Sequence, residues 1–297
     1  MNKLNHTSCP LCKGNHIHSV MSCTDYYATK EVFDVYRCDD CNFTFTQGVP
    51  VESEIGRYYE SPDYISHSDT RKGAMNTIYH WVRGLMLRRK ASLVETKLSG
   101  QKGHLLDVGT GTGYFPFTMV QRGWNVEAVE KNAAAREFAL KRFNLHVKED
   151  EDLEASPDES FDAITLWHVM EHLEHLDKAW STFYRLLKKN GVLVVAVPNC
   201  SSFDAAIYNK EWAAYDVPRH LWHFTPDTMK ILGEKYGFKL EDYRPMPFDA
   251  FYVSMLTERN LKHSCSFVRG LWNGFRAYLH AMGHKELSSS IIYIFRK

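Results

Sequence analysis

Short apolar runs alternate with amphipathic stretches from residue 104 to about residue 198. The apolar runs predict strands, and they cover residues 104–108, 124–130, 161–167 and 191–198. The stretches that follow the first three runs repeat apolar positions at helical spacing, and they cover residues 114–122, 132–143 and 170–189. Strands that alternate with helices predict an α/β fold, in which a mainly parallel sheet carries helices on both faces.

Weaker patterns lie on either side of this core. Residues 31–38 and 43–46 predict two strands of a small β unit near the N-terminus. A helical pattern runs from residue 76 to about residue 98, and residues 145–149 predict a short additional strand. Near the C-terminus, "YGFKLEDYRP" predicts a strand after a helix, and "SSSIIYIFRK" predicts the last strand.

A broad apolar face lies between these two C-terminal strands, in residues 246–287. Phe267, Leu271 and Phe275 recur there at helical spacing, together with Trp272 and Leu279. We expect this face to pack onto the rest of the domain. A lid over an apolar substrate and a contact between two subunits are the alternatives.

Composition and charge narrow the classes of function. The chain has 297 residues, of which 44% are hydrophobic, so it can bury a substantial core. Its 36 basic and 36 acidic residues balance, which argues against a dedicated nucleic-acid binder. We find no apolar run that could span a membrane and no apolar segment typical of a secretory signal. We therefore expect a cytoplasmic protein with reduced thiols, either a monomer or a homodimer.

Two C-x-x-C units predict a metal site. "CPLC" supplies Cys9 and Cys12, and "CDDC" supplies Cys38 and Cys41. Each unit can direct two sulfurs at one ion, and a doubled motif at this spacing is typical of a structural zinc ribbon. The alternatives are unligated thiols and a redox pair. A segment this small has little core of its own, so metal binding would supply much of its stability.

The stretch "HLLDVGTGTGYFPF", residues 104–117, places a glycine-rich turn between a predicted strand and a predicted helix. A dinucleotide-binding turn requires G-x-G-x-x-G, and Tyr114 occupies the position of its third glycine. The phosphate-binding motif G-x-x-x-x-G-K-[ST] is not present either. A turn with so much backbone freedom still indicates that a ligand approaches the main chain closely.

The turn resembles the first motif of the class I S-adenosylmethionine-dependent methyltransferases. The similarity extends from about residue 104 to residue 200 and includes "VEAVE" and "RLLKKNGVLVVAVPN". It implies a Rossmann-like sheet with an antiparallel last strand, and S-adenosylmethionine as the cofactor. Glu130 matches the acid that holds the ribose hydroxyls in that family, and Asp152 matches the acid near the adenine, with Asp150 as the reserve. The implied cofactor-binding residues are Asp107, Gly109, Thr110, Gly111, Gly113, Glu130, Asp152, Trp167 and His168.

Histidines are the candidates for a catalytic base, because their pKa lies near neutral pH. His168 follows a predicted strand in "WHVMEHLEHL", a string that resembles methyltransferases of quinones and small metabolites. His220 and His223 lie in "YDVPRHLWHF", and we prefer His220 as the base. Tyr215 and Arg219 of the same segment are candidate substrate residues. A resemblance in domain order to zinc-containing sugar methyltransferases adds Tyr64 and His67.

These patterns predict three parts: a zinc ribbon at 1–46, a linker and helical cap at 47–100, and a methyltransferase domain at 101–297. The last part carries insertions at 199–225 and 246–287. The function that we expect is methyl transfer to a small molecule such as a sugar or a quinone-like metabolite. An RNA or protein methyltransferase that uses the ribbon to bind a macromolecule is the alternative, followed by a cofactor-binding scaffold without activity.

Overall fold

A six-stranded sheet forms the centre of the protein, in a computed structural model that describes residues 3–51, 53–59, 74–246 and 248–297. The strands follow the order β11-β12-β9-β8-β6-β7. Their bounds are β6 His104–Val108, β7 Asn125–Val129, β8 Phe161–Trp167, β9 Leu187–Pro198, β11 Lys239–Pro245 and β12 Ser290–Arg296. The first four of these run parallel, and β12 lies antiparallel between β9 and β11. The predicted mostly parallel sheet with an antiparallel last strand is confirmed.

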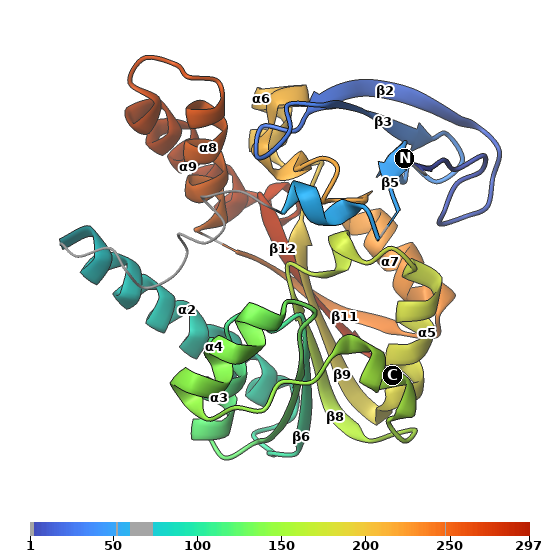
Figure 1. The fold of residues 1–297 in the computed structure, drawn as a ribbon, viewed down its shortest axis with the longest axis vertical. Coiled ribbons are helices and arrows are strands. Elements are labelled where there is room, and N and C mark those ends of the chain that lie inside the picture. The colour runs from blue at the N-terminus through green and yellow to red at the C-terminus, as the bar shows by residue number, and fades with distance from the viewer. Residues whose placement is uncertain (1–2, 52, 60–73, 247) are drawn as a thin grey trace.

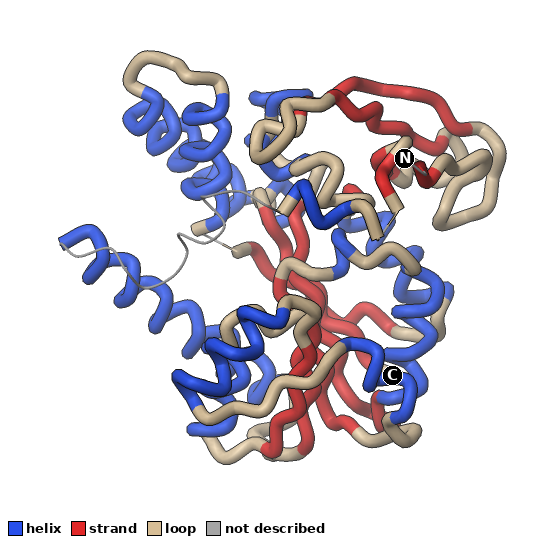
Figure 2. The backbone as a smooth tube through the Cα atoms, in the orientation of Figure 1, coloured by secondary structure: helices blue, strands red, loops and turns tan. Residues whose placement is uncertain are grey.

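Helices cover both faces of this sheet (Figure 2). They are α2 Ala74–Lys97, α3 Tyr114–Gln121, α4 Ala133–Phe143, α5 Leu176–Leu186 and α7 Pro226–Lys235. Successive strand residues point to opposite faces: Leu105 packs with residues of α2 and α3, whereas Leu106 packs in the cluster that includes α5 and α7. Thr225 caps α7 by accepting a hydrogen bond from the backbone N–H of Thr228, as the sequence Thr-Pro suggests.

A second, smaller sheet lies above the carboxyl ends of the parallel strands (Figure 1). It contains β2 Ile17–Thr24, β3 Val32–Cys38, β4 Thr44–Thr46 and β10 Trp222–His223. β10 belongs to the predicted insertion at 199–225 and pairs with β4. The insertion therefore shares one sheet with the N-terminal segment, by which we mean residues 3–51 and 53–59. β1 Lys3–Leu4 pairs with β5 Val49–Pro50 beside it. The domain boundaries expected from the sequence stay a prediction.

Several segments differ from the sequence-based expectation. Residues 145–149 contribute only an isolated bridge between Val129 and Lys148. The helix expected over 170–189 divides into a short 3-10 helix, η3 Met170–His172, and α5, and β9 already begins at Leu187. The remaining 3-10 helices are η1 Ile55–Tyr58, η2 Asp150–Ala155, η4 Asn209–Glu211, η5 Ala213–Tyr215 and η6 Lys285–Leu287. Among the described residues, no helix is long and apolar enough to cross a bilayer.

The helical hairpin of the second insertion buries its small residues and exposes its large apolar residues, which is the reverse of what we expected. It consists of α8 Asp249–Asn260 and α9 Ser266–Gly283, and α6 Phe203–Tyr208 lies against it. The small residues Gly270 and Gly274 of α9 face α8, where an added Cβ would lie 2.6 Å from the Cα atoms of Met255 and Phe251. The large apolar residues of α9 are therefore exposed, and they are Phe267, Val268, Leu271, Trp272, Phe275, Leu279 and Met282. The expectation that they pack onto the domain is wrong.

Candidate active site

A cavity of about 540 Å³ lies between the carboxyl ends of the parallel strands and the N-terminal segment. One wall comes from the turn after β6 and from the residues that follow β7 and β8. The other wall comes from β5, η1 and the loop before β10, which includes Arg219 and Leu221. Ligands of open α/β sheets bind at this end of the strands, where loops can surround them. The cavity is therefore the candidate active site.

The glycine-rich turn borders the cavity, and its three glycines have different surroundings. All three adopt positive φ angles, of 66° at Gly109, 55° at Gly111 and 84° at Gly113. A Cβ at Gly109 would lie 2.5 Å from a methyl group of Val169, and one at Gly113 would lie 2.9 Å from Cβ of Ala139. Apart from its two neighbours in the chain, no described residue has an atom within 4 Å of a Cβ built at Gly111. Gly111 thus offers bare main chain to open space, whereas Gly109 and Gly113 are required by packing.

Glu130 joins this turn to the end of β7. Its Oε2 accepts a hydrogen bond of 2.7 Å from the backbone N–H of Gly111, and its Oε1 accepts one of 2.9 Å from Asn132. Its carboxylate is half-buried and lines the cavity. Each oxygen has a second lone pair, so the carboxylate keeps the capacity to accept two further hydrogen bonds from a ligand.

Asp107 and Thr110, the other polar residues near the turn, do not line the cavity. The buried carboxylate of Asp107 accepts a hydrogen bond of 2.6 Å from Oγ1 of Thr165 on β8. Burial raises the pKa of Asp107 to about 6, because it disfavours the charged form. The backbone N–H of Thr110 donates to the carbonyl of Val129. Both residues fix the turn against its neighbouring strands.

His168 lies directly after β8 and also lines the cavity. Its Nε2 is 3.1 Å from Oδ2 of Asp249, and its Nδ1 is 3.4 Å from Oε1 of Glu171. Burial lowers the pKa of His168, but the two carboxylates outweigh this effect and raise the pKa to about 9. A histidine with this pKa is protonated at neutral pH, so it can donate hydrogen bonds but is poorly suited to act as a base. Sequence reasoning missed Asp249, because no motif marks the insertion that carries it.

Three further histidines lie near the opposite side of the cavity. His172, which was not a predicted base, lines it, and burial lowers the pKa of His172 to about 4. His220, the preferred base, does not line the cavity: it is buried beside His172, with 4.6 Å between the ring centroids. His223 does not line the cavity: it is buried in β10, where its Nε2 lies 2.9 Å from Oγ1 of Thr46. His172 was visible in the string "HVMEHL", but nothing in the sequence distinguished it from its neighbours.

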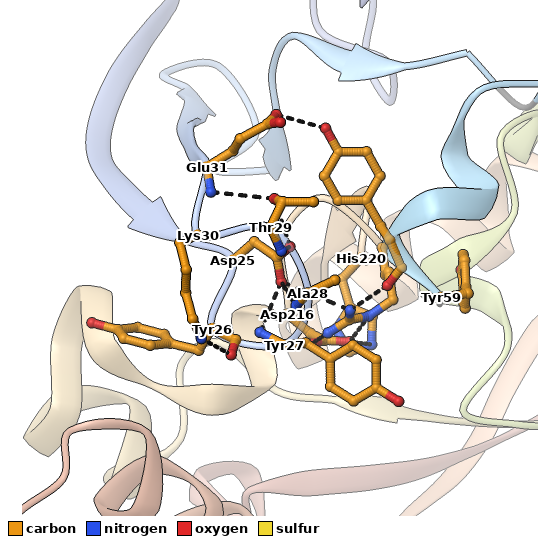
Figure 3. Close-up of polar contacts among 12 residues, drawn as sticks. Asp25, Tyr26, Tyr27, Ala28, Thr29, Lys30, Glu31, Tyr59, Asp216 and His220 are labelled. Atoms are coloured by element: carbon orange, nitrogen blue, oxygen red, sulfur yellow. Dashed lines mark hydrogen bonds and ion pairs between the residues drawn. The ribbon is translucent and has the colours of Figure 1, made fainter. Parts of the chain in front are cut away.

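Arg219 connects the insertion to the N-terminal segment. Its guanidinium donates to both carboxylate oxygens of Asp216 and, over 2.7 Å, to the carbonyl oxygen of Tyr58. Cζ of Arg219 lies 3.9 Å from the ring centroid of Tyr27, and its Nη1 lies 3.8 Å from Oδ1 of Asp25. Figure 3 shows Asp25, Tyr27 and Asp216 gathered at this contact. Arg219 borders the cavity, but its hydrogen bonds hold the cavity wall together.

Tyr215 and Trp167 lie outside the lining of the cavity. Tyr215 is buried against Trp212 and His223. Trp167 contacts Phe115, and Nζ of Lys90 lies 4.3 Å from the centroid of a Trp167 ring. Tyr64 and His67 lie outside the described residues, as do the side chains of Asp150 and Asp152, whose backbone forms part of η2.

The four predicted metal ligands come together at the edge of the N-terminal sheet. The Sγ atoms lie within 4.8 Å of one another, with 3.6 Å between Cys9 and Cys41 and 3.5 Å between Cys12 and Cys38. Zinc–sulfur bonds of about 2.3 Å in a tetrahedron place the sulfurs about 3.8 Å apart. Lys13 and Asn42, which follow the two motifs, adopt positive φ angles that complete matching turns. The arrangement suggests zinc binding.

Comparison with known proteins decides the family. Residues 79–243, more than half of the chain, match the family model described as a methyltransferase domain. The chain belongs to this methyltransferase family. The match covers the glycine-rich turn and Glu130, and the order of the strands agrees with a class I S-adenosylmethionine-dependent methyltransferase.

Curated relatives of this methyltransferase are similar over about half to two thirds of its length. It is 27% identical over 208 residues to the mitochondrial ubiquinone biosynthesis O-methyltransferase of Mus musculus, covering 64% of this chain and 56% of the relative. A ubiquinone/menaquinone biosynthesis C-methyltransferase of Brucella canis is 28% identical over 165 residues, 51% of this chain and 59% of the relative. The methyltransferase thus spans less than two thirds of both relatives.

Among solved structures, phosphoethanolamine N-methyltransferase 2 of Haemonchus contortus, in complex with S-adenosyl-L-methionine, is similar with a TM-score of 0.49. It is 17% identical, and the similarity covers 70% of this methyltransferase and 52% of that chain.

The residues of this methyltransferase fit the cofactor that its family uses. Gly111 leaves room for a ligand over the main chain, and Glu130 offers a half-buried carboxylate at the end of the adjacent strand. A carboxylate in this position can accept two hydrogen bonds from a vicinal diol. Both residues line the same cavity.

Proposed function

We propose that this chain transfers the methyl group of S-adenosylmethionine to an oxygen atom of a small molecule. The main support for the proposal is that Gly111 and Glu130 line the same cavity as His172 and Arg219. Bound S-adenosylmethionine would supply a methyl group that its sulfonium already activates. The task of the protein is then to align the acceptor and to exclude water.

The cofactor side of the cavity is the wall after β6 and β7. We assign the ribose hydroxyls to Glu130 and the methionine portion to the main chain at Gly111. Asp107 and Thr110 support the turn from behind, and Gly109 and Gly113 allow its close packing. Asp152 and Trp167 stay predictions.

The acceptor side is the wall formed by η1, η3 and the loop before β10. Two features favour a small molecule over an RNA or a protein. Tyr59 and Ile55 of the N-terminal segment line the cavity together with the strand ends, and its volume of about 540 Å³ suits a small molecule. The relatives named above are enzymes of quinone biosynthesis, and one of them is an O-methyltransferase. The mixture of apolar residues with Tyr59, His172 and Arg219 suits a hydroxylated, partly apolar metabolite.

Of the three candidate bases, we keep only His220 as an acceptor-side residue and add His172. His168 pairs with Asp249 and Glu171, and we infer that it orders the end of β8 and donates hydrogen bonds. His223 holds β10 against β4. Tyr215 supports His223, and Arg219 shapes the wall. Tyr64 and His67 stay predictions.

We further propose that Cys9, Cys12, Cys38 and Cys41 hold a structural zinc ion. A closed shell of four thiolates has no position for a substrate, so the ion would stabilise the N-terminal segment. Because β4 of that segment pairs with β10, the zinc site would indirectly support the wall of the cavity.

Labelled methyl groups test the proposed function directly. The purified chain is incubated with methyl-labelled S-adenosylmethionine and a cell extract that has been divided into metabolites and macromolecules. We expect the label in the metabolite fraction, together with an equal amount of S-adenosylhomocysteine. The Glu130→Ala variant should transfer at least about fivefold less label at a cofactor concentration that half-saturates the wild type, as follows from tenfold weaker binding. Label that appears only in RNA or protein would contradict the proposal.

A further inference from the structure

A second cluster of metal-ligand side chains lies on the acceptor side of the cavity. Glu171, His172 and His220 each direct one ligand atom into the same region, and these atoms lie within 4.8 Å of one another. Glu171 and His172 come from η3, whereas His220 comes from the loop before β10. The backbone N–H of Leu221 donates to the carbonyl of Glu171 over 2.8 Å, which fixes the loop to η3.

The hydrogen bonds of the two histidines define their tautomers. Nδ1 of His172 lies 2.9 Å from the carbonyl oxygen of Arg219, and Nδ1 of His220 lies 2.9 Å from that of Ala214. A carbonyl oxygen can only accept a hydrogen bond, so both Nδ1 atoms carry the proton in the neutral rings. Each Nε2 is therefore left with a lone pair. Histidines that bind metals are commonly oriented in this way, by donating the other N–H to a backbone carbonyl.

The third member of the cluster is a buried carboxylate that is not fully paired. Glu171 is 1% exposed, and its Oε1 lies 3.4 Å from Nδ1 of His168. Within the part of the chain that the structure describes, Oε2 receives no hydrogen bond. A buried carboxylate oxygen without a donor is costly, so the cluster favours a cation beside Glu171.

We propose that Glu171, His172 and His220 bind a divalent transition-metal ion, with zinc as the reference. Two imidazoles and one carboxylate form the ligand set of several catalytic zinc sites, which keep a fourth position open. Because His172 lines the cavity, the open position would be accessible to an oxygen atom of the acceptor. This last step rests on the proposed function, but binding of the metal does not.

The neighbouring groups agree with this assignment. Tyr59 approaches from the N-terminal segment, and its hydroxyl lies 3.3 Å from Nδ1 of His172. Oδ2 of Asp216 lies 3.7 Å from Nε2 of His220, but the Asp216 carboxylate is already held by Arg219. The close-up in Figure 3 includes Asp216, His220 and Tyr59. Tyr59 and Asp216 thus lie beside the two histidine ligands.

The number of zinc ions bound per chain tests this proposal. The full chain is dialysed against a fixed, buffered concentration of free zinc, and its metal content is measured by mass spectrometry. We expect two zinc ions for the wild type, one at the four cysteines and one at the new site. His220→Gln and Glu171→Gln should each bind one. His175→Gln is the matched control, because His175 is exposed at the start of α5, and it should bind two.

Two further measurements separate loss of the metal from loss of the fold, and neither requires methyl transfer. Binding of S-adenosylmethionine and far-ultraviolet circular dichroism show whether each variant is folded. One zinc ion in the folded wild type, or two in the folded His220→Gln and Glu171→Gln variants, would overturn the metal site. Either result would leave the proposed methyl transfer untouched, since label transfer is measured separately.

Discussion

At the scale of a single residue, burial of neutral His223 makes the stability of this protein depend on pH. His223 is 4% exposed, and burial lowers the pKa of its ring to about 3. In the unfolded chain the pKa is about 6.5. Between these two values the unfolded state binds more protons than the folded state, so the free energy of unfolding falls as the pH decreases through this window.

The His223→Gln variant should therefore lose less stability than the wild type between about pH 7 and pH 4. We expect the difference to be about 3 kcal/mol, which urea denaturation at the two pH values can measure. Glutamine can still hydrogen-bond to Thr46, so the comparison changes the ionisation more than the packing. Equal losses for the two proteins would show that His223 does not ionise on unfolding in this range.

The individual residues also show what the sequence could and could not predict. Glu130 and the glycine-rich turn were found because a motif fixes their spacing along the chain. The roles of the histidines were not predicted, because of His172, His220 and His223 only His172 lines the cavity. The positions of His220 and His223 depend on the pairing of β10 with β4, a contact between segments about 180 residues apart. Local patterns contain no information about such a contact.

At the scale of an element, helix α9 shows how an apolar pattern can mislead. Large apolar residues normally mark the buried face of a helix. In α9 the glycines form the buried face, because they allow the backbones of α8 and α9 to approach closely. The strands of the central sheet were predicted well, since helices on both faces require apolar residues at nearly every position.

The close approach of α8 and α9 predicts the effect of adding a methyl group. Gly274→Ala should lower the free energy of unfolding by about 1–3 kcal/mol, because the new Cβ would lie 2.6 Å from Cα of Phe251. Gly283→Ala on the same helix is the control, since among the described residues no atom outside the helix's own backbone and the chain neighbours lies within 4 Å of its Cβ. Thermal unfolding of both variants provides the comparison. Equal stability of the two would mean that the helices are not packed at this distance.

At the scale of the whole molecule, the N-terminal segment and the methyltransferase sheet form one site. The cavity takes lining residues from β5 and η1 as well as from the strand ends. Arg219 ties the two parts together through Asp25, Tyr27 and Tyr58. The sequence indicated both parts, since each has its own motif. It did not indicate that the small part contributes a wall to the cavity of the large one.

The proposed methyl transfer depends most on binding of S-adenosylmethionine at Gly111 and Glu130. Isothermal titration calorimetry with the wild type, Glu130→Ala and Glu137→Ala tests this most directly. Glu137 is an exposed glutamate on α4 and serves as the control. A hydrogen bond to a charged group contributes about 1.5–3 kcal/mol, so Glu130→Ala should bind at least about tenfold more weakly, whereas Glu137→Ala should match the wild type. Equal affinity of all three proteins, or no binding to the wild type, would contradict the account.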